Sequence, residues 1–495
     1  MLVDKCNIIY NRHRKENKMQ NTFAEIFTKL RKNSGLTQTA LGTMLGVSNR
    51  AVSKWETGLA LPSTDNIGKL AKIFGVPVDY FFSTKEDSRA EHVPPAGMKS
   101  LTGIYRIGRG PSSSHTMGPE KACRVLKSVY RTADSFKVTL YGSLAKTGTG
   151  HGTDRVIRET FSPYRCDIRF DRSKADLPHP NTMDISAYRE GRQIGLSRIT
   201  SVGGGRIFID GKEYGEGENI YPEASFEKIA DYCRKENIRL WQYAEHTEGP
   251  SVFEHLEKVW EEMKSSIERG LLDEGILPGG LGVTKRAKQL YNSQHIDESA
   301  QTRENREVCA YAFAVSEQNA CAERIVTAPT CGSSGVVPAV LYYQQKKRGY
   351  SDTEIVRALA AGGIVGNLIK TNASISGSEC GCQAEIGSAC AMASAALGEL
   401  FGLSLDKIEY AAEIAIEHHL GLTCDPICGL VQIPCIERNA VAAMRAINAV
   451  SLASFLSDSR KISLDKVIGV MHKTGLDIKR QYKETAEGGL AELKM

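Results

Sequence analysis

Three cysteines, Cys382, Cys424 and Cys435, lie in two segments that also contain glycine, SGSECGCQAEIG and GLTCDPICGLVQIPCIERNA. They are 42 and 11 positions apart, so neither gap has the C-x-x-C spacing of a zinc ribbon. Three soft thiolates from separate helices or loops suit an iron–sulfur cluster better than a zinc ion. A cluster held by only three thiolates leaves one iron open to act as a Lewis acid toward a substrate. The cysteines therefore predict an enzyme.

Two further segments combine hydroxyls, glycines and a histidine. In RIGRGPSSSHTMGPEKA, three serines, His115 and Thr116 precede a predicted helix that begins near Gly118. Hydroxyls and free amides at a helix N-terminus can bind a carboxylate. The candidate carboxylate ligands are Ser112, Ser113, Ser114 and Thr116. In GSLAKTGTGHGTD, glycines allow the backbone to close on a small ligand, and His151 follows them. Each segment alone is equally consistent with a capped turn carrying a surface histidine.

The cysteine distribution indicates a reducing compartment. The chain has 13 cysteines, of which seven fall between Cys331 and Cys435. This clustering favours metal binding or catalysis over a disulfide framework. The N-terminus lacks the apolar core of a secretory signal, and no uninterrupted apolar run is long enough for a membrane helix. We therefore expect a cytoplasmic protein.

Positive charge is concentrated near the N-terminus. Residues 1–85 carry 13 Lys and Arg against 6 Asp and Glu, whereas the rest of the chain carries 50 against 52. This distribution suggests that any nucleic acid is bound by the N-terminal part alone.

The N-terminal part is predicted to form a helix-turn-helix. Residues 36–45 form a predicted helix with Thr37 as N-cap, Gly46 and Val47 make a turn, and Ser48 caps a second helix. The segment resembles the Cro/C1-type (XRE) repressor domain, including SKWETG and LPSTDNIGKLAKIFGVPVDYFF. By that resemblance the residues that face DNA are Gln38, Ser48, Asn49, Arg50, Ser53 and Lys54. The alternative is a small helical bundle that makes only protein contacts.

The chain as a whole is predicted to be multidomain, with an all-α helix-turn-helix head, an α+β middle domain and an all-α helical C-terminal domain. The expected parts are a basic tail (1–18), the helix-turn-helix domain (19–84), a linker (85–99), the α+β domain (100–249) and the helical domain (250–495). Met19 is a possible true start of the chain. Helices in the last domain are predicted at 308–326, 353–370, 384–401, 405–420, 436–455 and 465–474.

Residues 100–490 closely resemble the bacterial iron–sulfur L-serine dehydratases, with the family's beta and alpha domains on one chain. The resemblance rests on many long phrases in the same order, including PSSSHTMGPEKA, YGSLAKTGTGHGTD, APTCGSSGVVPAVL, GCQAEIGSAC and LGLTCDPICGLVQIPCIERNA. It implies a [4Fe–4S] enzyme that converts L-serine to pyruvate and ammonia. The family's cluster ligands fall on Cys382, Cys424 and Cys435. Cys331, in the APTCG segment, is a further residue expected near the site.

The chain departs from the family pattern in two ways. Some members end in a cysteine that folds back onto the cluster, whereas this chain ends in GGLAELKM. The helix-turn-helix is also not part of the usual enzyme, which suggests that serine or the cluster's state alters DNA binding.

The general base of such a reaction needs a pKa near neutrality, which favours histidine. The best candidates are His115 and His151, followed by His418. One alternative is a pyridoxal-phosphate dehydratase, for which neither Lys146 nor Lys370 has a suitable setting. Another is a transcription regulator whose dehydratase-like body is an inactive serine or redox sensor. A homodimer is expected, because helix-turn-helix proteins and two-domain active sites commonly form dimers.

Overall fold

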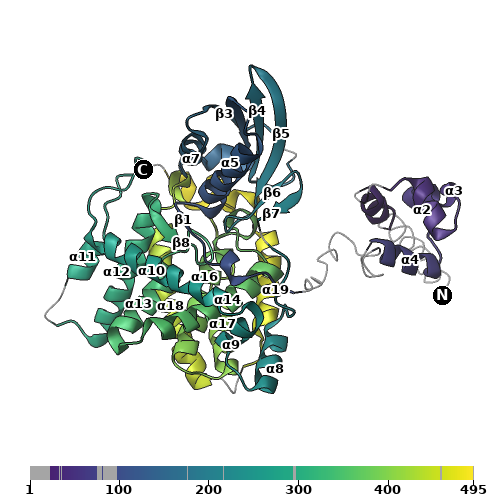
Figure 1. The fold of residues 1–495 in the computed structure, drawn as a ribbon. Coiled ribbons are helices and arrows are strands. Elements are labelled where there is room, and N and C mark those ends of the chain that lie inside the picture. The colour runs from purple at the N-terminus through teal and green to yellow at the C-terminus, as the bar shows by residue number, and fades with distance from the viewer. Residues whose placement is uncertain are drawn as a thin grey trace, which may run out of the picture. The chain divides into compact units, whose positions relative to one another are not determined.

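The computed structural model describes residues 23–493 except residues 33, 35, 75–80, 82–96, 175–176, 216, 294–296 and 457–459. The chain divides into two compact units, residues 1–93 and residues 94–495, both drawn in Figure 1. The predicted basic tail and most of the predicted linker lie outside the described residues.

The N-terminal unit is a small helical bundle. Its helices span residues 23–32, α2 (Gln38–Leu45), α3 (Asn49–Glu56) and α4 (Thr64–Phe74). The hydroxyl of Thr37 accepts a hydrogen bond from the Ala40 amide, and that of Ser48 accepts one from the Ala51 amide. Both predicted N-caps are therefore confirmed. The unit has its own apolar core, which includes Phe23, Phe27, Leu41, Val52, Trp55 and Leu70.

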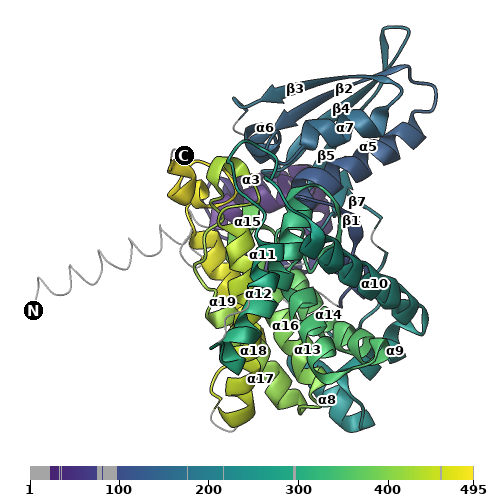
Figure 2. The ribbon, with the colours of Figure 1, turned by 90° about the vertical axis from the view of Figure 1, so that its left-hand side faces the viewer.

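The larger unit contains a mixed six-stranded sheet in the order β3-β2-β4-β5-β6-β7. The strands are β2 (Ser135–Tyr141), β3 (Arg165–Asp171), β4 (Thr182–Arg189), β5 (Arg192–Ser201), β6 (Ile207–Ile209) and β7 (Lys212–Tyr214). Strands β2 and β3 are parallel, and the other neighbouring pairs are antiparallel. Helices α5 (Gly118–Val129) and α7 (Thr153–Phe161) cover one face, as Figure 2 shows, and share an apolar core with the strands. The short helix α6 (Gly142–Thr147) follows β2 directly.

The rest of the larger unit is a helical body built around α16 (Ile386–Leu400). Residues 386–399 of this helix are all buried. Small residues allow its neighbours to approach closely: a side chain at Gly362 of α14 would come within 2.7 Å of the Met392 carbonyl. The surrounding helices are α8 (Phe226–Glu236), α9 (Leu240–Glu248), α10 (Ser251–Leu272), α11 (Ala287–Asn292), α12 (Ala300–Ala320), α13 (Val336–Arg348), α14 (Asp352–Asn372), α17 (Leu405–Glu417), α18 (Cys435–Leu456) and α19 (Leu464–Asp477).

The prediction of one helix over residues 308–326 is wrong at its C-terminal end. Helix α12 stops at Ala320, and Ala322 adopts a left-handed conformation with φ of 60°. The chain then forms strand β8 (Arg324–Val326), which pairs antiparallel with β1 (Ile107–Arg109). Residues 324–326 form a strand because they pair with β1, which lies more than two hundred positions earlier in the sequence. The local spacing of apolar residues cannot reveal such a distant partner.

Helix α18 is the one helix in the described ranges whose length and mean hydropathy, 1.3, would suit a membrane span. It packs against α12, α16 and α17 as part of the helical body. These contacts account for its apolar composition, as in the core helices of globular proteins.

Candidate active site

Two histidine rings stack where the two predicted polar loops meet. Ser112 begins a π-helical turn, Ser113–Met117, that leads directly into α5. His151 lies in the turn between α6 and α7. The ring centroids of His115 and His151 are 4.4 Å apart, and the two residues are 0% and 1% exposed. The structure thus brings both candidate bases into one buried site.

The two nitrogens of His115 are both held by hydroxyls. The Ser143 hydroxyl donates to the backbone carbonyl of Glu484 at 2.7 Å. Its oxygen, 3.0 Å from His115 Nε2, therefore accepts the imidazole N–H, and Nδ1 accepts from the Ser114 hydroxyl at 2.9 Å. Burial, and next the neighbouring charge of His151, lowers the pKa of His115 well below its ordinary value. His115 is therefore neutral and held in one orientation.

His151 has a nitrogen available for chemistry. Its Nδ1 lies 2.9 Å from the Thr147 carbonyl and must donate to it, so Nε2 carries the lone pair. Nε2 is buried and has no hydrogen-bond partner among the described residues. Burial lowers the pKa of His151 to about 4, even though the bond to Thr147 acts in the opposite direction. At neutral pH the side chain is therefore an uncharged base, with a pKa below the near-neutral value predicted from the sequence.

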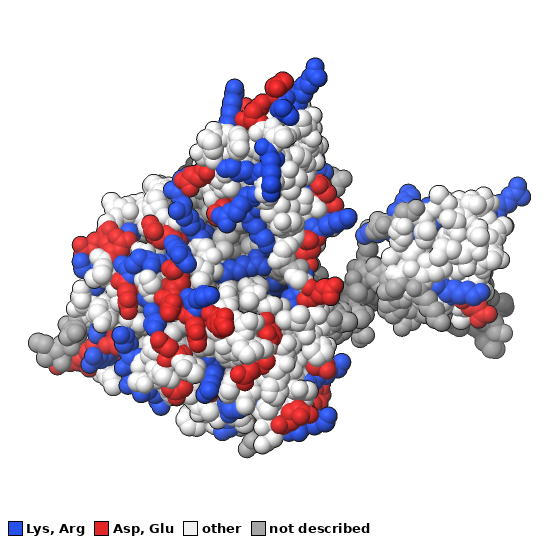
Figure 3. Space-filling view, viewed as in Figure 1, with Lys and Arg blue, Asp and Glu red and all other residues white. Residues whose placement is uncertain are grey.

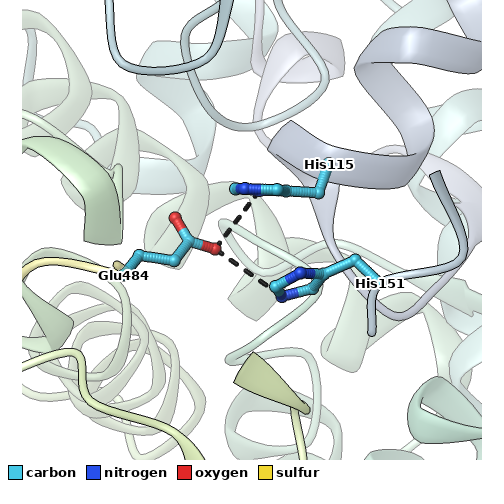
Figure 4. Close-up of side chains that lie close together, drawn as sticks. All are labelled: His115, His151 and Glu484. Carbon is cyan, nitrogen blue, oxygen red and sulfur yellow. Dashed lines mark ion pairs between the residues drawn. The ribbon is translucent and has the colours of Figure 1, made fainter. Parts of the chain in front are cut away.

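Glu484, from the C-terminal tail, points its carboxyl group at both rings (Figure 4). Its Oε1 atom is 3.4 Å from His115 Nδ1 and 3.9 Å from His151 Nε2. Burial raises the pKa of Glu484 well above its ordinary value, and the nearby charges of Glu385 and Cys382 add to this effect. These effects favour the protonated form of the carboxyl group. The ligand atoms of the two histidines and Glu484 lie within 4.8 Å of one another, which would also suit a shared metal ion.

Backbone hydrogen bonds hold the tail in this position. The Cys424 amide donates to the Tyr482 carbonyl at 2.9 Å, and the Glu484 amide donates to the Cys424 carbonyl at 2.7 Å. Further along, the Leu490 amide donates to the Asp425 carboxylate at 3.0 Å. The tail therefore pairs with the very segment that supplies one of the candidate cluster ligands.

The three candidate ligand cysteines gather beside Glu484. Cys382 lies in a short turn ahead of α16, Cys424 lies in the segment paired with the tail, and Cys435 is the first residue of α18. A hydrogen bond joins the thiols of Cys424 and Cys382 and lowers the pKa of Cys382. The positive charge of Arg438, one turn into α18, acts on all three thiols.

This donor set fits an iron–sulfur cluster. The Cys382 and Cys424 thiols share a hydrogen bond and the charge of Cys382 acts on Cys435, so the three sulfur atoms lie near one another in a mostly buried pocket, as cluster ligation requires. The Arg438 guanidinium also offsets the negative charge that three bound thiolates would bring into that pocket. It is itself held by the Thr423 carbonyl at 2.7 Å and the Asp425 carboxylate at 3.1 Å.

The predicted hydroxyl cluster is buried, but most of its hydroxyls are already engaged. Those of Ser112 and Ser114 lie 3.4 Å and 2.9 Å from His115 Nδ1. The Thr116 hydroxyl donates to the His151 carbonyl at 2.8 Å. The Ser113 hydroxyl has no hydrogen bond among the described residues. Three of the four candidate carboxylate ligands therefore position the histidines in this structure.

A cavity of about 740 Å³ opens beside the site, lined in part by Ser143, Glu379 and Thr485. Its lining also includes three cationic side chains, those of Lys146, Arg480 and Lys483. Positive charge at this position would attract a carboxylate. Glu379 accepts a hydrogen bond from His179 at 2.9 Å, which orders the wall nearest α15 (Gly377–Cys380).

Sequence reasoning missed several groups of this site. Ser143 and Glu385 lie in the segments YGSLAKTG and GCQAEIG, which resemble the family. The sequence predicted no function for either residue. Glu385 is buried, and its carboxylate accepts a hydrogen bond from Thr330 at 2.8 Å and lies 3.8 Å from the Cys424 sulfur. Glu484 lies in a C-terminal segment for which the family resemblance predicts only a possible cysteine ligand. A glutamate in an otherwise polar tail carries no signal of burial.

Two further candidates, His418 and Cys331, differ in their exposure to solvent. His418 is 44% exposed, pairs with Glu417 at 3.2 Å, and has no described contact with the two stacked histidines. Cys331 is buried, with its sulfur 3.3 Å from the Met117 sulfur. Burial, and next the charge of Glu385, raises the pKa of Cys331. Cys331 therefore borders the site, whereas the contacts of His418 are with Glu417 and the Ile414 carbonyl of α17.

The candidate DNA-facing residues of the N-terminal unit are mostly exposed. Ser48, Asn49, Arg50 and Lys54 are exposed at or on α3, and Ser53 is half-buried. Gln38 differs, because its amide donates to Glu56 at 2.6 Å. Glu56 also pairs with Arg31 at 2.5 Å, so Gln38 belongs to a network that ties helices of the unit together.

Known protein families and relatives match most of the chain. The family model described as serine dehydratase alpha chain matches residues 125–491, and a helix-turn-helix model matches residues 28–81. An L-serine dehydratase of Streptomyces coelicolor is 39% identical over 452 residues, covering 79% of this chain and 98% of that protein. L-serine dehydratase 1 of Escherichia coli and an L-serine dehydratase of Haemophilus influenzae are each 38% identical over 450 residues, covering 80% of this chain and 99% of each relative.

Proposed function

The chain belongs to the serine dehydratase family, and from that premise we propose that it converts L-serine into pyruvate and ammonia with the help of a [4Fe–4S] cluster. Loss of the Cα proton and the β-hydroxyl gives 2-aminoacrylate and one water. The imine tautomer of that product takes up one water and releases ammonia, which leaves pyruvate. The reaction therefore needs a base, a group that protonates the leaving hydroxyl, and a site for the carboxylate.

Cys382, Cys424 and Cys435 would hold the cluster. When bound, the cluster supplies a Lewis-acidic iron that weakens the bond between the serine Cβ and its hydroxyl. Arg438 keeps the ligand segments in place through its bonds to Thr423 and Asp425.

His151 is the proposed general base, and its Nε2 atom is the single observation that carries the proposal. This nitrogen is buried, unprotonated and without a hydrogen-bond partner among the described residues. It accepts the Cα proton of a serine lying between the histidines and the thiols. His115 packs on the ring of His151 and keeps its own N–H directed at Ser143, so it is a positioning residue.

Glu484 is the proposed source of the proton that the leaving hydroxyl requires. Its raised pKa favours the protonated carboxyl group, and its Oε1 lies 3.4 Å from His115 Nδ1 and 3.9 Å from His151 Nε2. The substrate carboxylate would enter past Lys146 and Lys483, with the Ser113 hydroxyl as a further contact.

The experiment is serine-dependent pyruvate formation by full-length protein purified without oxygen, with iron and sulfide measured on the same sample. We expect activity in proportion to a content of about four irons per chain, and its loss in air. A fully loaded cluster without pyruvate formation would overturn the proposal and favour an inactive serine- or redox-sensing regulator.

We also propose that the N-terminal unit binds DNA. The observation that favours this function is the exposed row Asn49, Arg50 and Lys54 on the second helix of the motif. Coupling to the enzyme is testable by gel-shift titrations with and without serine, and before and after air oxidation. Equal DNA affinity under all these conditions would exclude control by serine or by the cluster.

A further inference from the structure

A buried polar cluster joins one end of the sheet to the helical body. Asn181 precedes β4, Ser201 is the last residue of β5, and Ser376 and Ser378 lie at the start of α15. All four residues are at most 5% exposed. The visible surface of the larger unit carries charged side chains of both signs (Figure 3), whereas this cluster is uncharged and lies in the interior. Buried polar atoms normally have hydrogen-bond partners, so an atom without one calls for an explanation.

Two atoms of the cluster have no hydrogen-bond partner among the described residues, Asn181 Oδ1 and Ser201 Oγ. The orientation of the Asn181 amide is fixed, because its Nδ2 group donates to the Ser201 carbonyl and to the Ser378 hydroxyl, both at 3.2 Å. A carbonyl only accepts hydrogen bonds, so Oδ1 cannot take the place of Nδ2. The Ser201 amide in turn donates to the Asn181 carbonyl at 2.9 Å. The paired residues therefore offer an unused acceptor and an unused hydroxyl.

Asn181 is linked to the stacked histidines through the residue before it. The Pro180 carbonyl accepts a hydrogen bond from the Ser143 amide at 2.9 Å. The Ser143 hydroxyl is the group that accepts the N–H of His115 at 3.0 Å. Pro180 and Ser143 both line the cavity of about 740 Å³. The segment that carries Asn181 therefore forms part of the wall of the proposed substrate cavity.

Helix α15 links the cluster to the candidate iron–sulfur ligands. Ser378, which accepts from the Asn181 amide, also lines the cavity. One position earlier, a side chain at Gly377 would come within 2.9 Å of the Cys424 sulfur. Asn181 and Cys424 therefore approach neighbouring residues of the same short helix.

The charge on this wall of the cavity favours a bound cation. His179 Nδ1 accepts from the Asn181 amide at 3.0 Å, so its Nε2 carries the proton and donates to Glu379 at 2.9 Å. The Ser374 hydroxyl donates to the other oxygen of Glu379. Burial acts to raise the pKa of Glu379, but these hydrogen bonds outweigh it and lower the pKa below its ordinary value. Glu379, which lines the cavity, is therefore ionised and attracts positive charge.

We propose that Asn181 and Ser201 bind the α-ammonium group of L-serine, an inference that rests on the proposed function. An ammonium group has three donors and no acceptor, which matches two unused oxygen atoms on a wall that also carries an ionised carboxylate. A carboxylate has only acceptors and cannot satisfy Asn181 Oδ1. The pair therefore selects hydroxy acids that carry an α-ammonium group, and it fixes the position of the serine Cα.

The test compares L-serine with 3-hydroxypropionate, which is serine without its ammonium group. Full-length protein carrying its cluster is assayed for the kcat and KM of serine and for competitive inhibition by 3-hydroxypropionate. Asn181→Ala removes the acceptor and the amide donors, whereas Asn181→Asp keeps an acceptor oxygen and loses the amide donors. Ser201→Ala removes a hydroxyl without a described partner, so it keeps the test valid if the first variant folds poorly. The matched control is Asn367→Ala, a buried asparagine that donates to the Lys99 carbonyl at 2.6 Å.

We expect Asn181→Ala to raise the KM of serine about tenfold or more, and Ser201→Ala about threefold or more, with smaller changes in kcat. Inhibition by 3-hydroxypropionate should be unchanged in both variants, because this compound has no ammonium group to lose. Asn181→Asp should keep a KM close to that of the wild type, and the control should match the wild type in both measurements.

The proposal is overturned if Asn181→Ala and Ser201→Ala leave the KM of serine unchanged. It is equally overturned if they weaken serine and 3-hydroxypropionate alike, or if Asn181→Asp is no better than Asn181→Ala, because a purely structural role gives those results. Failure of the proposed function would appear separately, as a wild type that forms no pyruvate. Serine would then not be consumed, and its affinity for the same variants would be measured by calorimetry.

Discussion

The candidate active site and the DNA-facing helix of the N-terminal unit place their polar residues in opposite surroundings. The active site takes its groups from residues 115 to 484 and buries them, so each has a defined partner and a shifted pKa. Helix α3 takes its candidate groups from a few consecutive positions and exposes most of them. We therefore expect single substitutions to have large effects in the first region and moderate, salt-dependent effects in the second.

The largest expected effect is loss of the cluster. Cys424→Ala removes one of three thiols in a pocket where the other two remain close, so iron content and pyruvate formation should both be lost. Cys390→Ala is the matched control, because Cys390 is a buried cysteine that donates to the Ala442 carbonyl in the helical body. Iron and sulfide assays on both variants provide the measurement. Normal iron content in Cys424→Ala would contradict the ligand assignment.

The next effect concerns the base. His151→Ala should lower kcat by about a hundredfold or more with the iron content unchanged, because the proton acceptor is lost. His418→Ala serves as control, since His418 is exposed and its Nδ1 atom lies near Glu417 and the Ile414 carbonyl, both of α17. The measurement is kcat from steady-state pyruvate formation by both variants. Near-wild-type turnover in His151→Ala would remove this residue from the mechanism.

Effects at the exposed helix should be smaller. Arg50→Ala and Lys54→Ala should each weaken DNA binding by about tenfold and reduce its dependence on salt, as expected where a cation contacts phosphate. Lys69→Ala, an exposed cation on α4, is the control. Fluorescence anisotropy at two salt concentrations measures the effect. If all three variants bind DNA alike, the helix-turn-helix acts by protein contacts instead.

The smallest expected effect is a shift in pH dependence. Burial lowers the pKa of His151 to about 4, so the base remains unprotonated well below the ordinary histidine value of 6.5. Activity should therefore be lost only as the pH falls below 6.5 toward that value. The pH profile of kcat/KM tests this, and an acid limb above pH 6.5 would contradict a buried, neutral His151.

The two regions also differ in how far the sequence anticipated them. In the helix-turn-helix, Thr37 and Ser48 were predicted as N-caps, and both make the expected bonds, because capping depends on residues three positions away. In the enzyme part, the stacking of His115 on His151 and the position of Glu484 depend on segments far apart in the chain. Strand β8 was mistaken for helix for the same reason, since its partner is β1.

The sequence by itself determined the helix-turn-helix, the family, the three candidate cluster cysteines and the two histidines, because these depend on residue type and local spacing. The tertiary structure alone decided that the predicted serine cluster orients the histidines and that the tail brings Glu484 to both of their rings. The physical reason is that burial, protonation and tautomer depend on neighbours brought together by folding. These properties set what a side chain can do, and no stretch of the sequence contains them.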